Sequence, residues 1–245
     1  MSHSIEVINL SKSYGVKKAV NNINFKVEDN KIIGLLGPNG CGKTTTIAMI
    51  LGLLKPSSGK VLINGKNIED HRINLLHNMN FISPYIELPK KLTVRQNLEV
   101  YGRLYGIKDL KNRITEIADD LNLNNFLIKK TGELSSGQKN RVSLAKSLIN
   151  KPDVLFLDEP TASLDPDIGD FVRQYIETYK SKNQITILLA SHNMKEVERL
   201  CDTVVMMKEG QIVDRGTCKQ LIGKHGRDNL EDTFLKIARS KNELA

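Results

Sequence analysis

The most informative segment of this chain reads Gly37-Pro38-Asn39-Gly40-Cys41-Gly42-Lys43-Thr44-Thr45. Its spacing matches the pattern G-x-x-x-x-G-K-[ST]. An apolar run at residues 32–36 precedes it, and residues 44–54 follow it with the pattern of a helix. A glycine-rich turn between a buried strand and a helix is typical of a phosphate-binding loop.

The residue types in this loop predict how it holds a nucleotide. Its glycines let the backbone curl so that successive N–H groups point at phosphate oxygens, and the following helix adds its positive end. Lys43 supplies a charge for the β- and γ-phosphates, and the Thr44 hydroxyl is a ligand for Mg²⁺. Cys41 fits as a small residue, and a thiol beside phosphates would also make the site sensitive to alkylation. We therefore expect residues 37–45 to bind ATP with Mg²⁺.

A second apolar strand, at residues 154–157, ends in the acidic pair Asp158-Glu159. Adjacent residues of a strand point to opposite faces, so the two carboxylates are expected to have different roles. Asp158 is predicted to reach Mg²⁺, directly or through water, and Glu159 to polarise the water that attacks the γ-phosphorus. The alternative is a solvated acidic pair before the Pro160 turn. The phosphate-binding pattern upstream favours the catalytic interpretation.

The remaining sequence predicts an α/β core that a block of helices interrupts. Strands are expected at 4–10, 19–27, 60–63, 185–190, 203–207 and 211–214, with a hairpin turn at Glu209-Gly210. Helices are expected at 168–179 and from Leu230 onward. The helical block covers about 90–150. One of its faces is predicted to contain Leu98, Tyr101, Leu104 and Tyr105, and another Ile114, Ile117, Ala118 and Leu121.

Composition indicates a globular protein without a nucleic-acid partner. Lys and Arg total 36 against 28 Asp and Glu, a net charge of +8, but no dense basic block occurs along the 245 residues. The three cysteines are far apart and suggest a reducing compartment. We see neither a signal peptide nor an apolar run long enough to span a bilayer, so a membrane role would need another chain.

The segment at 134–138 opens a helical pattern over 139–148. It reads Leu134-Ser135-Ser136-Gly137-Gln138 and resembles the LSGGQ signature of ABC ATPases. Later in the chain, Ser163-Leu164-Asp165 is similar to the D-loop of that family, and His192, after a buried strand, to its switch histidine. Tyr14, which is expected in a turn between the first two strands, is similar to the aromatic residue that stacks on adenine. The resemblance extends from the first strand to about Gly223.

This resemblance implies a fold and a division of roles between two copies. The fold would be α/β, a P-loop NTPase core with an N-terminal antiparallel β subdomain and an inserted all-helical subdomain. Residues 1–223 would form the nucleotide-binding domain, with the helical subdomain at about 90–150, and residues 224–245 a C-terminal helical tail. In the family the signature caps the ATP held by the partner subunit, which implies a homodimer with ATP. His192 would contact the γ-phosphate, and Asp165 would belong to the same composite site.

The sequence departs from the family where a Gln is expected ahead of Leu92-Thr93-Val94. No Gln occurs between Lys43 and Arg95, and the ungapped spacing places Pro84 near the expected position. Gln96 falls on the wrong side of that run and belongs to the start of a helix, so it does not replace the missing residue. The candidates to replace it are Ser83, Glu87 or a water. Ser136 also replaces a signature glycine.

The leading hypothesis for function is the ATP-hydrolysing subunit of a transporter with separately encoded membrane subunits, located on the cytoplasmic face of the membrane. The segment 101–106, Tyr-Gly-Arg-Leu-Tyr-Gly, is similar to ATPases of ABC-2-type exporters. One alternative is a soluble ABC-type ATPase that acts on ribosomes or DNA. Another, motivated by the missing Gln, is a nucleotide-dependent binding module with little turnover.

Overall fold

The computed structural model describes residues 3–84 and 86–239, which divide into two compact units. The first unit combines the chain up to Leu75 with the chain from Thr186 onward, and the second comprises Leu76–Ile185. A core that is interrupted and then resumed was the expectation from the sequence. The helices predicted at about 90–150 all lie in the second unit.

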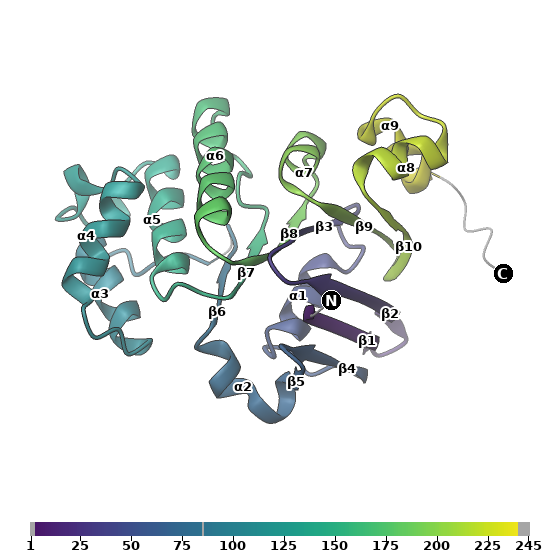
Figure 1. Ribbon diagram of the computed structural model, residues 1–245, viewed down its shortest axis with the longest axis horizontal. Helices are drawn as coiled ribbons and strands as arrows, with labels where there is room; N and C mark the ends of the chain where they lie inside the picture. Colours follow the sequence, from purple (N-terminus) through teal and green to yellow (C-terminus); the bar gives the residue numbers. More distant parts are fainter. Residues whose placement is uncertain (1–2, 85, 240–245) are drawn as a thin grey trace. The chain divides into compact units, whose positions relative to one another are not determined.

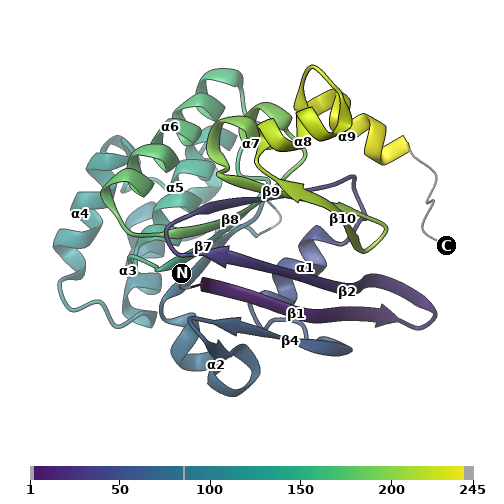
Figure 2. The ribbon, with the colours of Figure 1, turned by 45° about the vertical axis from the view of Figure 1, so that its right-hand side comes forward.

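An antiparallel sheet forms one layer of the first unit, with β1 (His3–Tyr14) between β2 (Lys17–Glu28) and β4 (Ser58–Ile63), and β5 (Lys66–Asn67) at the edge. Figure 2 shows β1, β2 and β4 side by side. Alternate residues such as Val7, Ile23 and Phe25 are buried, as the alternating sequence predicts. Tyr14 was expected in the turn, but it is the last residue of β1 because the hairpin turns only at 15–16.

A second sheet of the first unit carries the segments that matter for function. Here β3 (Ile32–Leu36) runs parallel to β8 (Thr186–Ser191) on one side and to β9 (Thr203–Lys208) on the other. Every residue of β3 and β8 is buried, which explains their continuous apolar runs. The last strand, β10 (Gln211–Gly216), pairs antiparallel with β9. The hairpin turn between them is confirmed, because Glu209 and Gly210 both have positive φ.

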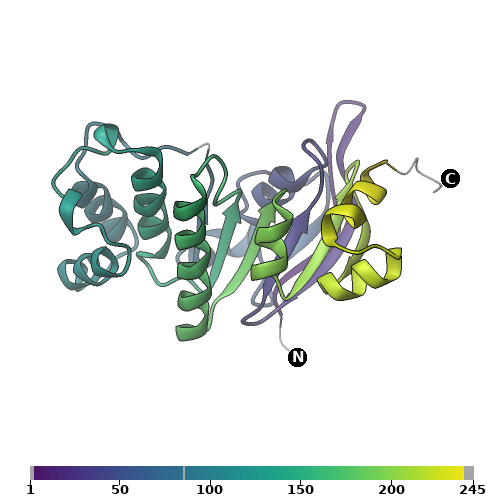
Figure 3. The same ribbon diagram turned by 90° about the horizontal axis from the view of Figure 1, so that it is seen from above.

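Helices of the first unit follow these strands. They are α1 (Lys43–Ile50), α7 (Met194–Leu200), α8 (Cys218–His225) and α9 (Leu230–Arg239), while α2 (Ile68–Leu76) leads into the second unit. Helix α1 ends earlier than expected, since Leu51 is its C-cap and Gly52 adopts positive φ. Helices α8 and α9, yellow in Figure 3, lie against each other, and Leu230 is fully buried in the cluster they share with α7.

The second unit is mainly helical. It contains β6 (Met79–Ile82) parallel to β7 (Val154–Asp158), together with α3 (Val94–Leu104), α4 (Leu110–Asp120), α5 (Ser136–Leu148), α6 (Pro166–Lys182) and short 3₁₀ turns at Asn124–Phe126 and Thr131–Glu133. Figure 1 shows α3, α4 and α5 grouped together. The predicted buried face of α4, Ile114, Ile117, Ala118 and Leu121, is confirmed.

The predicted apolar face of α3 is wrong at Leu104, whose relative exposure is 68%. Gly102 occupies the position facing α4 instead, because a Cβ there would collide with Leu110. Leu98 is buried, and the two tyrosines are partly buried. Across residues 3–84 and 86–239, no helix combines the length and the apolar character that a bilayer span requires.

Candidate functional site

The loop at 37–45 connects β3 to α1 and depends on glycine at two positions. A Cβ on Gly37 would collide with Cys41 and with the carbonyl of Met207, and one on Gly42 would lie 2.6 Å from the carbonyl oxygen of Ala19. Gly42 also adopts a φ of 109°, a region that residues with a side chain rarely occupy. Packing against neighbouring strands therefore fixes the curled path of this loop.

The electrostatics of the loop favour an anion. Gly42 is the N-cap of α1 and forms no side-chain cap, and the first turn contains no acidic residue, so the positive end of the helix is not neutralised locally. Lys43 is buried, and its Nζ donates hydrogen bonds to the carbonyl oxygens of Gly37, at 2.6 Å, and Pro38, at 3.3 Å. A positive charge and a helix N-terminus meet in one curled loop, which fits a phosphate group.

Cys41 faces the interior rather than the mouth of the loop. Its side chain is buried, and its carbonyl accepts a hydrogen bond of 3.0 Å from the N–H of Gly210. Burial raises the pKa of the Cys41 thiol. A neutral, buried thiol reacts slowly. The structure thus disfavours the sensitivity to alkylation that the sequence suggested.

His192 leaves the sheet next to the phosphate-binding loop. Strand β8 ends at Ser191, which pairs with Leu36 in the parallel register of β3 and β8. His192 and Gly37 therefore emerge from adjacent strands at the same edge of the sheet. The histidine is exposed and precedes Asn193, the N-cap of α7.

Tyr14 stands at the end of β1 with 54% of its surface exposed. The Nζ of Lys12 lies 5.4 Å from the centroid of the tyrosine ring and also donates a 2.8 Å hydrogen bond to the carbonyl oxygen of Lys55. One face of the ring is therefore held by a cation–π contact. An exposed ring anchored in this way suits stacking against a planar group.

In the second unit, the acidic pair at the end of β7 divides between two environments. Asp158 is the last residue of the strand and is 1% exposed, whereas Glu159 is partly exposed and adopts a φ of 52°. A positive φ is rare for a residue with a side chain and costs energy, and such residues cluster at functional sites. The turn is fixed to α5, because Asn140 donates a 2.8 Å hydrogen bond to the carbonyl oxygen of Pro160.

The signature-like segment begins α5 with a reciprocal cap. Ser135 is the N-cap: its hydroxyl accepts from the N–H of Gln138 at 3.3 Å, and its own N–H donates to the side-chain oxygen of Gln138 at 3.1 Å. Gly137 packs so closely on Ile168 that a Cβ would collide with it. Ser135 and Ser136 are exposed, and so is Asp165, the N-cap of α6.

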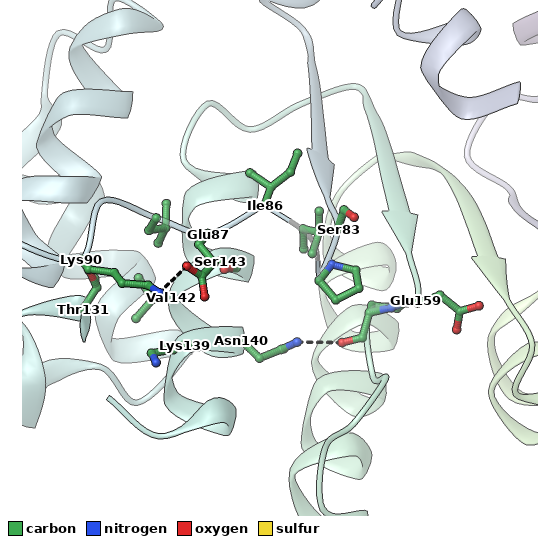
Figure 4. Close-up of a pocket in the computed structure, with 14 residues that line it drawn as sticks. Ser83, Ile86, Glu87, Lys90, Thr131, Lys139, Asn140, Val142, Ser143 and Glu159 are labelled. Carbon is green, nitrogen blue, oxygen red and sulfur yellow. Dashed lines mark hydrogen bonds and ion pairs between the residues drawn. The ribbon is translucent and has the colours of Figure 1, made fainter. Parts of the chain in front are cut away.

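The segment that lacks the expected Gln lines a cavity of about 150 Å³ beside α5. Figure 4 shows its lining, with Glu87 directed toward Lys90 and Asn140 toward the turn after Glu159. Glu87 forms an ion pair of 2.6 Å with Lys90, whereas Ser83 is buried. The carboxylate of Glu87 is therefore engaged with a neighbouring lysine.

Sequence analysis missed a lysine that lies behind this segment. The Nζ of Lys146, on α5, donates a 2.9 Å hydrogen bond to the carbonyl oxygen of Phe81 and lies 5.4 Å from the centroid of the Tyr101 ring. Burial lowers the pKa of Lys146 to about 8. The apolar residues Val142 and Ile149, four positions before it and three after it on the same helix side, were the available signal.

This lysine makes a testable contribution to stability. From about pH 8 up to the ordinary value near 10.5, Lys146 is protonated in the unfolded chain but largely neutral in the folded one. The unfolded state then binds more protons, so this group favours folding increasingly as pH rises through that window. We expect the free energy of unfolding of the wild type, relative to Lys146→Met, to increase across it in urea titrations. Lys139, a partly exposed lysine of the same helix, provides the control. The difference in free energy of unfolding between the wild type and Lys139→Met should not change across this pH range.

Comparison with known proteins identifies the family of this chain. The family model described as "ABC transporter" matches residues 20–162. The chain belongs to the ABC transporter ATP-binding family. The matched region contains the phosphate-binding loop, the signature-like segment and the acidic pair, whereas Tyr14, residues 163–165 and His192 lie outside it.

Full-length relatives and a solved structure agree with the family model. Nod factor export ATP-binding protein I of Burkholderia orbicola is 37% identical over 98% of this chain and 80% of that protein. Bacitracin transport ATP-binding protein BcrA of Bacillus licheniformis is 38% identical over 87% of this chain and 70% of that protein. The structure of an ATP-binding subunit of an ABC transporter superposes with a TM-score of 0.87 at 26% identity, covering 95% of this chain and 98% of that one. The expected α/β fold of an ABC ATPase is thereby confirmed.

Proposed function

We propose that this chain binds and hydrolyses ATP and thereby powers export through a separately encoded membrane subunit. The observation that carries the proposal is the loop at 37–45, in which the amine of Lys43 and the uncapped start of α1 occupy one sterically fixed curl. Membership of the ABC transporter family, with relatives that serve export, supports a role in transport over the soluble ATPase that acts on ribosomes or DNA.

The residues of the chain would divide the work on ATP as follows. Lys43 and the N–H groups of the loop neutralise phosphate charge, and Tyr14 offers its exposed ring to the adenine. Thr44 and Asp158 are the proposed ligands of Mg²⁺, which when bound draws negative charge from the phosphate oxygens. Mg²⁺ in such sites takes few protein ligands.

Hydrolysis itself is assigned to Glu159, with His192 and a second copy of the chain assisting. Glu159 accepts a proton from the attacking water, and His192 donates a hydrogen bond toward the terminal phosphate. Ser135, Ser136 and Asp165 are exposed, which would let them meet the nucleotide held by a second copy. The helix N-terminus that Ser135 caps is a suitable group to face phosphate.

The relatives favour export, and exposed apolar residues of the second unit favour docking of a membrane subunit. The names of the similar proteins include Nod factor export and bacitracin transport. Ile86, beside the cavity of the second unit, and Leu104 on α3 are exposed apolar residues in that unit. A membrane subunit that docks on the second unit would cover them, and this chain would then lie on the cytoplasmic face of the membrane.

The test is to search the neighbouring reading frames for a polytopic membrane protein and to express the chain together with it. We expect the two to co-purify and the ATPase rate in vesicles to exceed that of the chain alone, with Lys43→Ala as the inactive control. Leu104→Asp should reduce co-purification but leave the ATPase rate of the chain alone unchanged. Binding to ribosomes or DNA that falls steeply with salt, without a membrane partner, would instead support the soluble alternative.

A further inference from the structure

A buried carboxylate lies directly behind the turn that presents His192. Glu196, on α7, has 0% relative exposure. Its Oε2 accepts a 2.6 Å hydrogen bond from the hydroxyl of Ser191, which is itself fully buried. An acid in the first turn of a helix is stabilised by the helix dipole, but an exposed position would serve that purpose equally well.

The same serine hydroxyl also holds the residue after the histidine. Ser191 Oγ accepts a 3.0 Å hydrogen bond from the N–H of Asn193, and the side chain of Asn193 accepts one of 3.3 Å from the N–H of Glu196. Ser191 and Asn193, the two neighbours of His192, are therefore both hydrogen-bonded to Glu196. The cap alone would start α7, so the buried carboxylate does more than begin the helix.

The location of this network connects it to the phosphate-binding loop. Ser191 pairs with Leu36, the residue immediately before that loop, and Leu36 also packs in the same buried cluster as Val197 of α7. His192 is exposed and directly follows Ser191 in the chain. A shift of Ser191 would move the histidine relative to the loop.

We propose that Glu196, through Ser191, is the positioning residue that holds His192 at the terminal phosphate. Burying a carboxylate is unfavourable unless hydrogen bonds compensate, and here a compensating hydroxyl belongs to the residue before the histidine. The inference rests on the function proposed above, because it assigns His192 a role in ATP hydrolysis. It concerns a residue that contacts neither substrate nor metal.

A double-mutant cycle with the full chain tests this assignment. Glu196→Gln keeps the shape of the side chain but weakens the charged hydrogen bond from Ser191. We expect kcat for ATP to fall about 10- to 100-fold with KM nearly unchanged, because a small misplacement of a catalytic group affects the reaction more than binding. In the His192→Ala background, the same Glu196→Gln change should have almost no further effect.

Two controls separate positioning from a loss of structure. Glu198→Gln alters a nearby acid of α7, which accepts a hydrogen bond from the N–H of Leu230, and should leave kcat unchanged. Ser191→Ala should repeat the effect of Glu196→Gln if the latter variant does not fold. A reduction in kcat of equal size with and without His192 would overturn the proposal and indicate a structural role.

A spectroscopic measurement covers the case in which His192→Ala is inactive. The imidazole NMR signal of His192 should shift or broaden in Glu196→Gln and remain in place in Glu198→Gln. An unchanged signal in Glu196→Gln would refute the link. Failure of the proposed function would look different, because the wild type would then not hydrolyse ATP even with its membrane partner.

Discussion

Replacing Glu159 by Gln is expected to lower the rate of ATP hydrolysis about 10²- to 10⁴-fold while ATP still binds. The amide preserves the size of the side chain and the φ of 52° at this position, but it cannot accept a proton from water. Binding should persist, because Lys43 and the loop at 37–45 are unchanged. Because the bound ATP is not hydrolysed, the ATP-bound dimer should also accumulate.

The measurement combines steady-state ATPase assays, an ATP-binding titration and size-exclusion chromatography with ATP. Asp153→Asn is the matched control, since Asp153 is an exposed acid just before the other end of β7. The control should hydrolyse ATP at the parental rate. If Glu159→Gln also does so, Glu159 is not the base and the mechanism must use another group.

Replacing Gly42 by Ala is expected to abolish detectable ATP binding and to destabilise the fold by about 1–3 kcal/mol. The new Cβ would lie 2.6 Å from the carbonyl oxygen of Ala19 at a φ of 109°, so the loop must change its path. Once it does, the amine of Lys43 and the start of α1 no longer point into one curl. Binding energy is lost because both groups must face the phosphates together.

Gly40→Ala provides the comparison within the same loop. Gly40 also has a positive φ, of 78°, but no atom lies within 4 Å of a Cβ placed there. We expect only the cost of backbone strain and a smaller loss of affinity. Urea unfolding measures the stability of both variants, and ATP titration measures their affinity. An ATP affinity of Gly42→Ala equal to that of the wild type would contradict the role of this loop.

Several features of the site could be read from short stretches of sequence. The loop at 37–45, the strand ending at Asp158 and the helix start at Ser135 each depend on residues adjacent in the chain, because turns, strand alternation and caps are local. The capping pair of Ser135 and Gln138, for instance, follows directly from a spacing of three residues. Local spacing also placed Gln96 correctly at the start of α3.

Other features depended on partners that are distant in sequence. Lys146 is perturbed because it meets the carbonyl of Phe81, 65 residues away, and Cys41 is turned inward where Gly210 and Gly37 surround it. Helical spacing placed Leu104 on the apolar face of α3, but Gly102 packs against Leu110 instead and Leu104 is exposed. Whether a side chain is exposed to solvent or covered by a distant segment cannot be read from its neighbours in the sequence.

Short stretches of the sequence were sufficient to identify this chain as an ABC-family ATPase, because the residues of the phosphate-binding loop and of the signature must occur at fixed spacings to shape their own backbone. The side chains that support these segments became visible only in the folded chain. Leu36 and Ser191 become neighbours through the pairing of β3 and β8, and this pairing brings His192 beside the loop with Glu196 buried behind it. Burial and hydrogen bonding between such segments exist only after the strands have packed, so the charged residues they stabilise are identified only in the folded chain.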